Sequence, residues 1–375
     1  MNSMDRILVT GGMGFIGSHT VDELVKRGYE VKVMDNLEHQ VHGGVAPSYK
    51  NKDAKYLHGD IRHRKSWLAA LQDVDSVIHL AGSVGIGQSF WEAKKYVDTN
   101  VSGTALMYEL LTKDVKLRKR INKIVVASSK SLYGEGSYVC EEHGLQAPDV
   151  RPIKQLQRKE WEVKCPVCGQ DLVPTGVMES KYPQNLNPYS LSKYATERPA
   201  MDYSYSLGIP TVAFRYFNVY GERQSLSNPY TGVMAIFLSR IKNKNSPFLF
   251  EDGKQLRDYI YVKDVARLNA NALNHGSGVY NLGTGNGTSL LEVVHKLNQA
   301  LGTDIRPTVS NEFRPGDNRH DFADISLLIR DFGKNDFTPL EKGIKILAQW
   351  SEGIESVDRF EKEEAERKKF LSAIN

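Results

Sequence analysis

Apolar and polar residues along the first half of the chain alternate between two kinds of pattern. Short runs rich in β-branched residues predict buried strands, and the longer amphipathic stretches between them predict helices. The expected strands are Arg6–Thr10, Glu30–Met34, Lys55–His58, Ser76–Leu80, Lys123–Ser128 and Pro210–Arg215. The expected helices are Gly14–Lys26, Ala93–Thr112 and Tyr189–Leu207. Strands that alternate with helices in this way predict an α/β fold with a doubly wound parallel sheet.

Beyond Asn218 the pattern becomes less regular, because Pro, Asn and Gly separate shorter elements. We therefore expect a large first lobe and a smaller C-terminal lobe, with one return of the chain to the first lobe. The first lobe would comprise residues 1–216 and the return segment 258–282, and the second would comprise residues 217–257 and 283–375. Residues 358–369 are nearly all charged, which predicts a solvated helix.

A polar segment with little periodicity, residues 137–187, interrupts the alternation and contains all three cysteines. A segment of this length inside a compact lobe usually has a function or needs a local staple. It contains two pairs of metal-binding residue types, which are Cys140 with His143 and Cys165 with Cys168. Two pairs at this spacing can close a tetrahedral Cys3His site, which is typical of structural zinc. The alternative is free thiols and an exposed histidine in a loose loop.

Composition narrows the class of protein. The chain has 375 residues, of which 40% are hydrophobic, as is typical of a soluble globular protein. The formal charge of +4 is too small over this length to indicate nucleic-acid binding. The N-terminal residues do not resemble a signal peptide, and no apolar stretch approaches the length of a membrane-spanning helix. Three cysteines form no disulfide framework, so we expect a cytoplasmic protein without nucleic-acid or membrane partners.

A glycine-rich turn, TGGMGFIG at residues 10–17, connects the first expected strand to the first expected helix. Gly11 permits a tight turn, Gly14 lets the backbone approach a pyrophosphate, and Gly17 allows the helix to pack closely on the strand. The first helical N–H groups, near Phe15 and Ile16, are then free to bind phosphate oxygens. The sequence therefore predicts a Rossmann-type dinucleotide-binding domain.

Asp35 ends the second expected strand, at the position of a carboxylate that binds a ribose. It would accept hydrogen bonds from both ribose hydroxyls but repel a 2′-phosphate, so NAD is favoured over NADP. The alternative is that Asp35 only caps a turn with Asn36. Further candidates stand at the carboxyl ends of expected strands, where ligands bind in such sheets; they are Asp60, Ile61, Leu80 and Ala81. His79, taken alone, is more simply a core histidine.

Tyr189 and Lys193 stand four residues apart, which places them on one face of an expected helix. A phenol titrates near pH 10 and is a poor base at neutrality, but a nearby cation would favour the phenolate. The alternative is two unrelated surface residues. Upstream, Ser129 follows a strand end and supplies a hydroxyl.

At this point the sequence resembles a known family, the extended short-chain dehydrogenases/reductases that act on nucleotide sugars. The resemblance covers nearly the whole chain apart from the polar segment 137–187, which we call the insertion, and the C-terminal tail. Its motifs occur in order: TGGMGFIG at 10–17, Asp35-Asn36-Leu37, Gly59-Asp60-Ile61, TNVSGT at 99–104, SSKSLYG at 128–134, YSLSK at 189–193, RYFNVYG at 215–221, RDY at 257–259 and RPGD at 314–317.

The resemblance implies a role for each matching residue. Tyr189 would be the general base on a sugar hydroxyl, Lys193 would hold the nicotinamide ribose and lower the Tyr189 pKa, and Ser129 would hydrogen-bond the reacting oxygen. Asn100 and Tyr216 would contact NAD. The C-terminal lobe would bind the substrate through Asn218, Phe248, Arg257, Arg314 and Asp317. The resemblance also implies a homodimer, in which the helices Ala93–Thr112 and Tyr189–Leu207 pair across a two-fold axis.

The residues after Ser129 bear on the reaction. Dehydratases of this family carry an Asp-Glu pair where this chain has Lys130 and Ser131, so the acid and base for elimination are missing. The resemblance then favours an NAD-dependent 4-epimerase of a UDP- or dTDP-sugar that acts through a transient 4-keto intermediate. The alternatives are a dehydratase or reductase of the same fold, and a catalytically idle NAD-binding scaffold. Asp321 stands where many epimerases carry a residue that gates pocket volume, and the insertion resembles that of dTDP-L-rhamnose 4-epimerases.

Overall fold

The computed structural model describes residues 5–184, 187–228, 230–361 and 364–365. Its centre is a seven-stranded parallel sheet in the order β13-β9-β5-β4-β1-β2-β3. The strands are β1 (Arg6–Thr10), β2 (Glu30–Asp35), β3 (Lys55–His58), β4 (Ser76–His79), β5 (Lys123–Ser129), β9 (Thr211–Tyr216) and β13 (Gly278–Leu282). This confirms the expected doubly wound sheet, whose strand order reverses direction between β1 and β4.

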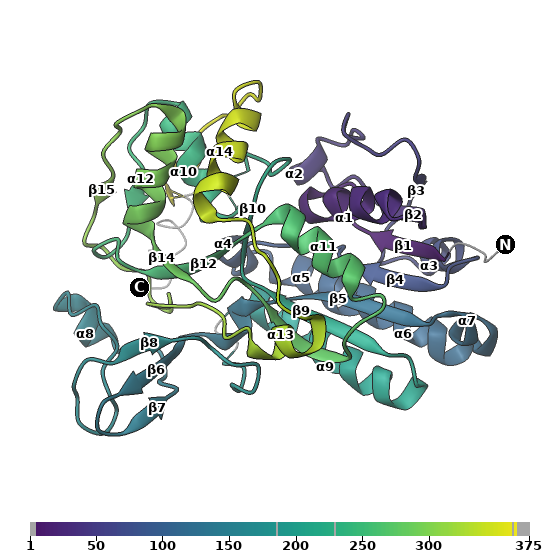
Figure 1. The fold of residues 1–375 in the computed structure, drawn as a ribbon, viewed down its shortest axis with the longest axis horizontal. Helices are drawn as coiled ribbons and strands as arrows, with labels where there is room; N and C mark the ends of the chain where they lie inside the picture. The colour runs from purple at the N-terminus through teal and green to yellow at the C-terminus, as the bar shows by residue number, and fades with distance from the viewer. Residues whose placement is uncertain (1–4, 185–186, 229, 362–363, 366–375) are drawn as a thin grey trace.

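Helices cover both faces of the large sheet (Figure 1). Successive side chains of a strand point to opposite faces, so Ile7 packs with the core under α1 and α11, whereas Leu8 packs with the core under α3, α6 and α9. The helices of this lobe are α1 (Phe15–Lys26), α2 (His39–His42), α3 (Arg64–Leu71), α4 (Ile86–Ser89), α5 (Ala93–Tyr96), α6 (Gly103–Lys113), α7 (Val115–Arg120), α9 (Pro188–Leu207) and α11 (Val262–Asn271), with a 3-10 turn at Lys130–Tyr133.

The expected helix Ala93–Thr112 is present, but its middle is a π-helix over Val97–Ser102. The backbone carbonyl of Asn100 accepts hydrogen bonds from the hydroxyls of Thr104, at 2.7 Å, and Thr196, at 3.1 Å. Side-chain donors that compete for a helical carbonyl are an ordinary cause of such a widened turn. This turn packs against α9.

The start of α9 is fixed by local chemistry. The side chain of Asn187 accepts a hydrogen bond from the Ser190 N–H at 2.8 Å, and the Ser190 hydroxyl accepts one from the Asn187 N–H at 3.2 Å. Pro188 occupies the first turn of the helix. Gly208 ends the helix in the left-handed conformation. Tyr189 is therefore held in the first turn of a doubly capped helix.

The C-terminal lobe lies at the upper left of Figure 1. Its two small sheets contain β10 (Asn218–Tyr220), β12 (Leu256–Tyr261) and β14 (Gly287–Ser289), and β11 (Phe248–Leu249) with β15 (Thr308–Val309). Its helices are α10 (Val233–Lys242), α12 (Leu290–Leu301) and α14 (Leu340–Ser351). Within the expected return segment, α11 and β13 join the large lobe, whereas β12 pairs with β10 and β14. A later helix, α13 (Ser326–Phe332), also packs against the large lobe.

Residues 360–361 and 364–365 are helical, as expected of the end of the chain, but this helix is not fully solvated. Phe360 is an apolar residue within the charged run. Its side chain is buried, and its ring centre lies 5.5 Å from that of Phe248. Glu364 is buried as well. The remaining residues of the expected helix, 362–363 and 366–369, lie outside the described residues.

The insertion forms a small antiparallel sheet in the order β7-β6-β8 at the lower left of Figure 1. Its elements are β6 (Ser137–Cys140), β7 (Gly144–Gln146), α8 (Ile153–Gln157) and β8 (Val173–Thr175). A compact core of Tyr138, Cys140, Val163, Cys165 and Leu172 holds the sheet together. The segment is therefore an ordered module and not a loose loop.

Candidate functional site

A cavity of about 1370 Å³ lies between the carboxyl edge of the large sheet and the C-terminal lobe. This volume exceeds the roughly 300–1,000 Å³ of a site for one small molecule, so two ligands can lie side by side. Of the residues predicted from the sequence, those that line it are Gly11, Gly14, Phe15, Ile16, Asp35, Asn36, Ile61, Leu80, Ala81, Ser129, Tyr189, Lys193, Tyr216, Asn218, Phe248, Arg257, Arg314 and Asp317.

The glycine-rich turn has a shape that only glycine permits. Gly11 has φ +67°, and a Cβ on it would lie 2.8 Å from the backbone N of Ala81. A Cβ on Gly17 would lie 2.0 Å from the carbonyl O of Gly11. Gly14 meets only the Gly11 carbonyl, at 3.3 Å, and caps the N-terminus of α1 at the cavity wall. This leaves exposed backbone and free helical N–H groups that fit a pyrophosphate.

Asp35 lies at the end of β2, beside this turn. Its carboxylate accepts hydrogen bonds from the backbone N–H groups of Met13, at 3.0 Å, and Leu37, at 2.9 Å, and His42 Nε2 lies 3.9 Å away. Asp35 therefore caps a turn and also lines the cavity. A negative charge here fits the ribose hydroxyls of NAD and disfavours a 2′-phosphate.

Asp60 and Asn100 were predicted to contact the cofactor, but they do not line the cavity. Asp60 is held by Arg62 and Asn36; burial opposes its charge, yet these hydrogen bonds keep its pKa at about 2. Asn100 accepts from the N–H of Ser83 at 2.7 Å and donates to the hydroxyl of Ser192 at 2.9 Å. Asn100 thus ties a cavity loop to the helix of Tyr189.

His79 is a buried core residue, as the simpler interpretation held. Its ring hydrogen-bonds the hydroxyls of Thr10, at 2.7 Å, and Thr104, at 2.9 Å. Burial is the main cause that lowers its pKa to about 3, so the ring is neutral at physiological pH.

Ser129, Tyr189 and Lys193 meet where β5 ends beside the first turns of α9. The Ser129 hydroxyl accepts the Ser131 N–H at 3.2 Å and also hydrogen-bonds the Tyr189 phenol. The Lys193 ammonium donates to the carbonyl of Ala127 at 3.0 Å. All three residues line the cavity.

The electrostatics of this group differ from the expectation that Lys193 lowers the Tyr189 pKa. Burial raises the pKa of Tyr189 above its ordinary value, and the hydrogen bond from Ser129 opposes that rise. Burial also lowers the pKa of Lys193 to about 8. Loss of water around both groups disfavours their charged forms, and this outweighs the attraction that spacing alone suggests.

The far end of the cavity is aromatic and basic. The Phe248 and Phe250 rings are 5.1 Å apart, and the Arg314 guanidinium lies 3.9 Å from the centre of the Phe250 ring. In the described part of the chain, the Arg314 Nε is buried without a hydrogen-bond partner. Arg257, by contrast, donates to the backbone carbonyls of Leu256, Asn318 and Arg319 at 2.8–2.9 Å. The Asn218 amide donates to the carbonyl of Asp258.

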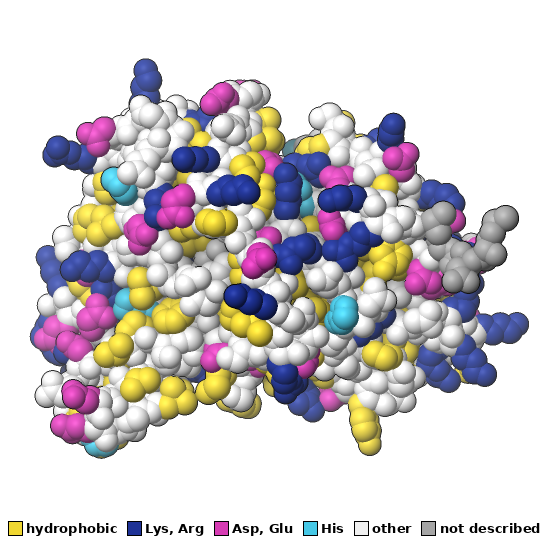
Figure 2. Space-filling model, in the orientation of Figure 1, with side chains coloured by type: hydrophobic (Ala, Val, Ile, Leu, Met, Phe, Trp, Pro, Cys, Tyr) yellow, Lys and Arg dark blue, Asp and Glu magenta, His cyan; other side chains and the backbone are white. Residues whose placement is uncertain are grey.

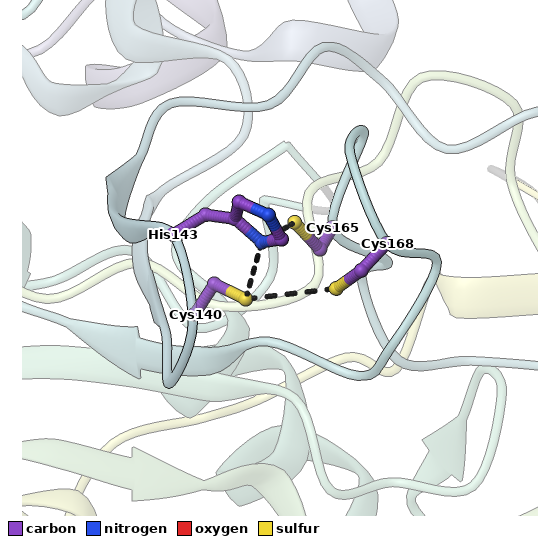
Figure 3. Close-up of side chains that lie close together, drawn as sticks. All are labelled: Cys140, His143, Cys165 and Cys168. Atoms are coloured by element: carbon purple, nitrogen blue, oxygen red, sulfur yellow. Dashed lines mark hydrogen bonds between the residues drawn. The ribbon is translucent and has the colours of Figure 1, made fainter.

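The four residues predicted to bind zinc come together in the insertion (Figure 3). Cys140 Sγ lies 3.4 Å from His143 Nδ1 and 3.7 Å from Cys168 Sγ, and Cys165 Sγ lies 3.8 Å from His143 Nδ1. All four ligand atoms lie within 4.8 Å of one another. A tetrahedral zinc site has bonds of about 2.3 Å to sulfur and about 2.0–2.1 Å to nitrogen, which gives edges of about 3.6–3.8 Å.

Comparison with known proteins adds a family. A family model described as GDP-mannose 4,6 dehydratase matches residues 8–149, and the NAD dependent epimerase/dehydratase family matches residues 169–283. A dTDP-L-rhamnose 4-epimerase of Burkholderia thailandensis is 32% identical to this chain and covers 92% of it, and the match spans 94% of that relative. The chain belongs to the NAD dependent epimerase/dehydratase family.

Other relatives and solved structures agree with membership of this epimerase/dehydratase family. A putative UDP-glucose 4-epimerase of Methanocaldococcus jannaschii is 33% identical over 92% of this chain and 97% of its own length. The UDP-glucose 4-epimerase of Thermotoga maritima, solved with UDP-glucose, superposes with a TM-score of 0.74 at 29% identity, over 92% and 98% of the two chains. The enzyme of Thermus thermophilus, solved with NAD, gives 0.73 at 28% identity, over 93% and 100%.

Two residues of this family member were not predicted to act together. Lys130, directly after Ser129, lines the cavity and forms an ion pair with the buried carboxylate of Asp321, which also accepts a hydrogen bond from Asn318. Asp321 therefore lies behind the cavity wall. The position of Lys130 beside Ser129 was visible in the sequence, but its partner lies 191 residues away.

Lys, Arg, Asp and Glu side chains are interspersed over the face shown in Figure 2. Among the helices of the described residues, none is both long and apolar enough to cross a membrane.

Proposed function

We propose that this protein is an NAD-dependent 4-epimerase of a nucleotide-diphosphate sugar, with UDP or dTDP as the nucleotide. One observation carries the proposal. Ser129, Tyr189 and Lys193 line the same large cavity as the glycine-rich turn and the Phe250–Arg314 pair. A sugar hydroxyl can thus lie beside a phenol and a nicotinamide, while its nucleotide lies at the other end.

The chain's own residues supply the proton chemistry. Tyr189 takes the proton of the C4 hydroxyl as that carbon becomes a ketone, and Ser129 hydrogen-bonds the reacting oxygen. NAD, when bound, would accept a hydride from C4 of the sugar and would return it to the opposite face of that carbon. Tyr189 would be favoured as the phenolate by the positive charge of the oxidised nicotinamide, which would oppose the effect of burial. The net reaction consumes no reductant.

The aromatic and basic end of the cavity supports a nucleotide diphosphate there. Phe248 and Phe250 provide flat apolar surfaces for a base. The buried Nε of Arg314 has no hydrogen-bond partner among the described residues, and a guanidinium suits phosphate oxygens. Asn218, Arg257 and Asp317 complete the proposed substrate contacts from the same wall.

A panel of UDP- and dTDP-sugars, with products identified by mass and NMR, tests this function. We expect a product of unchanged mass and inverted C4. dTDP-L-rhamnose belongs in the panel, because the Burkholderia relative is named for it. Loss of water would instead show a dehydratase, and net consumption of NADH would show a reductase. Absence of turnover across the panel would favour an idle NAD-binding scaffold.

We also propose that Cys140, His143, Cys165 and Cys168 hold one structural zinc ion. Three of their six separations, 3.4, 3.7 and 3.8 Å, are close to the edges of a tetrahedral Cys3His site, and all four ligand atoms lie within 4.8 Å of one another. Four protein ligands leave no open position, so the metal would stabilise the module and take no part in the reaction. The three cysteines are free, which is typical of a reducing compartment and supports a cytoplasmic location.

A homodimer is the last part of the proposal. Three exposed apolar side chains lie on or beside neighbouring helices. They are Phe90 after α4, Val97 in the π-helix and Leu191 in α9. These helices contact each other within the chain. A second copy that covered this face would remove the exposed apolar surface from water.

A further inference from the structure

The wall of the cavity at its nucleotide end has little secondary structure of its own. Arg314, Asp317 and Asn318 line the cavity from a segment without helix or strand, which contains the turn at Gly316. Phe250, which stacks under Arg314, is followed by Glu251 in the left-handed conformation, with φ +53°. Segments of this kind need contacts from elsewhere to hold one conformation.

Arg151, in the cysteine-bearing insertion, provides such contacts from behind. Its side chain is only 1% exposed. Its guanidinium binds both carboxylate oxygens of Glu251, at 2.8 and 3.1 Å, and also donates to the backbone carbonyls of Asp317, at 2.9 Å, and Trp161, at 2.8 Å. One planar fork therefore joins the insertion to both segments of the cavity wall.

Glu135, just before the insertion, braces the other end of the wall. Its fully buried carboxylate accepts hydrogen bonds from the backbone N–H of Arg319, at 2.8 and 3.0 Å, and from the hydroxyl of Tyr138, at 2.6 Å. Arg319 is itself fully buried and pairs with Glu251 and with Glu162 of the insertion. The carbonyl of Arg319 in turn receives the guanidinium of Arg257.

These contacts connect the proposed metal site to the cavity. Tyr138 and Cys140 lie on the same strand, β6, and share one small core with Val163 and Cys165. Trp161, which binds Arg151, and Glu162, which binds Arg319, directly precede Val163 of that core in the chain. The module therefore contacts the wall through two buried guanidinium groups, which are Arg151 binding the Trp161 carbonyl and Arg319 binding the partly exposed Glu162.

We propose that the cysteine-bearing insertion is a positioning element of the nucleotide site, and that Arg151 and Glu135 fix the Phe250–Glu251 and Arg314–Asp321 segments against the nucleotide diphosphate. The proposal rests on the assignment of that end of the cavity to a nucleotide. Arg151 touches no ligand itself. It acts through Phe250 and Arg314, so its loss weakens nucleotide binding and leaves the chemistry at Tyr189 in place.

Titration calorimetry of the NAD-loaded protein with UDP and with dTDP tests this without requiring turnover. Arg151→Lys keeps the charge but cannot bind Glu251, Asp317 and Trp161 together. We expect its Kd for the preferred nucleotide to rise by about 10- to 100-fold, the size of effect known for small misplacements of binding groups. Glu135→Gln should act in the same direction. Arg158→Ala, in an exposed pair with Glu160 of the same insertion, is the matched control and should leave the Kd unchanged.

Kinetics separate positioning from general damage. For Arg151→Lys we expect KM to rise with the Kd while kcat and NAD content stay within about twofold of wild type. An unchanged nucleotide Kd in folded Arg151→Lys would overturn the inference, as would an equal loss in the Arg158→Ala control. If wild type binds UDP or dTDP and Arg151→Lys weakens it, the inference stands even where no sugar of the panel is epimerised. Failure of the proposed function is thus distinguishable from failure of this inference.

Discussion

At the scale of single residues, burial sets the chemistry of the cavity. Tyr189 and Lys193 share a helix turn, and loss of water raises the pKa of the phenol and lowers the pKa of the ammonium to about 8. Ser129 is the neighbour whose hydrogen bond favours the Tyr189 phenolate. If Tyr189 is the base, as we propose, the pKa of its phenol depends on the hydrogen bond from Ser129 as well as on burial.

Replacing Tyr189 by Phe removes the base and little else. We expect Tyr189→Phe to fold, to retain NAD and to lose turnover by about 10²–10⁴-fold, the usual contribution of a positioned acid–base group. Initial rates with the substrate found in the panel, measured beside NAD content, check this. Near wild-type turnover would exclude Tyr189 as the base.

Replacing Ser129 by Ala should move the pH profile. The hydrogen bond from Ser129 lowers the Tyr189 pKa, so its loss raises that pKa and a higher pH is needed to form the phenolate. A hydrogen bond is worth about 1 kcal/mol, so the acid limb of kcat/KM should move up by about 0.5–1 pH unit. An acid limb that moved down would contradict this assignment.

Residue types and spacing revealed part of this site before the fold was known. The glycines at 11, 14 and 17 and the pair Tyr189–Lys193 depend on local geometry, so their placement at the cavity was predictable from the sequence. The pair Lys130–Asp321 and the bridge from Arg151 to Glu251 join positions 191 and 100 residues apart. Only the fold brings such charges together, and desolvation, which reverses the expected Tyr189 shift, is likewise a property of the fold.

At the scale of elements, hydrophobic pattern predicted six of the seven strands of the large sheet to within one residue at each end, mainly because most of them are buried. It did not predict β13 as a strand, and placed those residues only within a return segment. It did not predict the π-helix at Val97–Ser102, within which the Asn100 carbonyl accepts hydrogen bonds from the hydroxyls of Thr104 and Thr196. Nor did it predict the sheet of the insertion, whose short strands carry few apolar residues. In the insertion, the spacing of the cysteines and His143 was the informative signal, because it predicted that these residues come together.

Replacing Cys165 by Ser tests the metal in that element. We expect about one zinc per chain in wild type and a loss of most of it in Cys165→Ser, because a hydroxyl replaces a thiolate ligand. Elemental analysis measures the metal, and limited proteolysis should show earlier cleavage within residues 137–187. NAD content serves as the control and should not change. Metal-free wild type with the same protease resistance would exclude a structural zinc.

At the scale of the whole molecule, the exposed apolar side chains near α4, the π-helix and α9 are the surface that we propose a second copy of the chain covers. We expect a homodimer at micromolar concentration by light scattering. Val97→Glu places a charge on this face, away from the cavity, and should shift the population toward monomer. Val139→Glu, at a similarly exposed valine of the insertion, is the control. A wild-type monomer would contradict the two-fold assembly.

The place of the insertion in the chain bears on the order of folding. Ser129 and Tyr189 stand on either side of it, so these two hydroxyls, which we propose to be catalytic, meet only after the chain between them has closed into a loop. The insertion has its own small core around Tyr138, Val163 and Leu172, and a segment that compacts by itself shortens the loop that remains to be closed. Each halving of a flexible loop saves about 0.6 kcal/mol of closure entropy. A module that binds nothing in the reaction can therefore set how quickly the newly made chain acquires an active site.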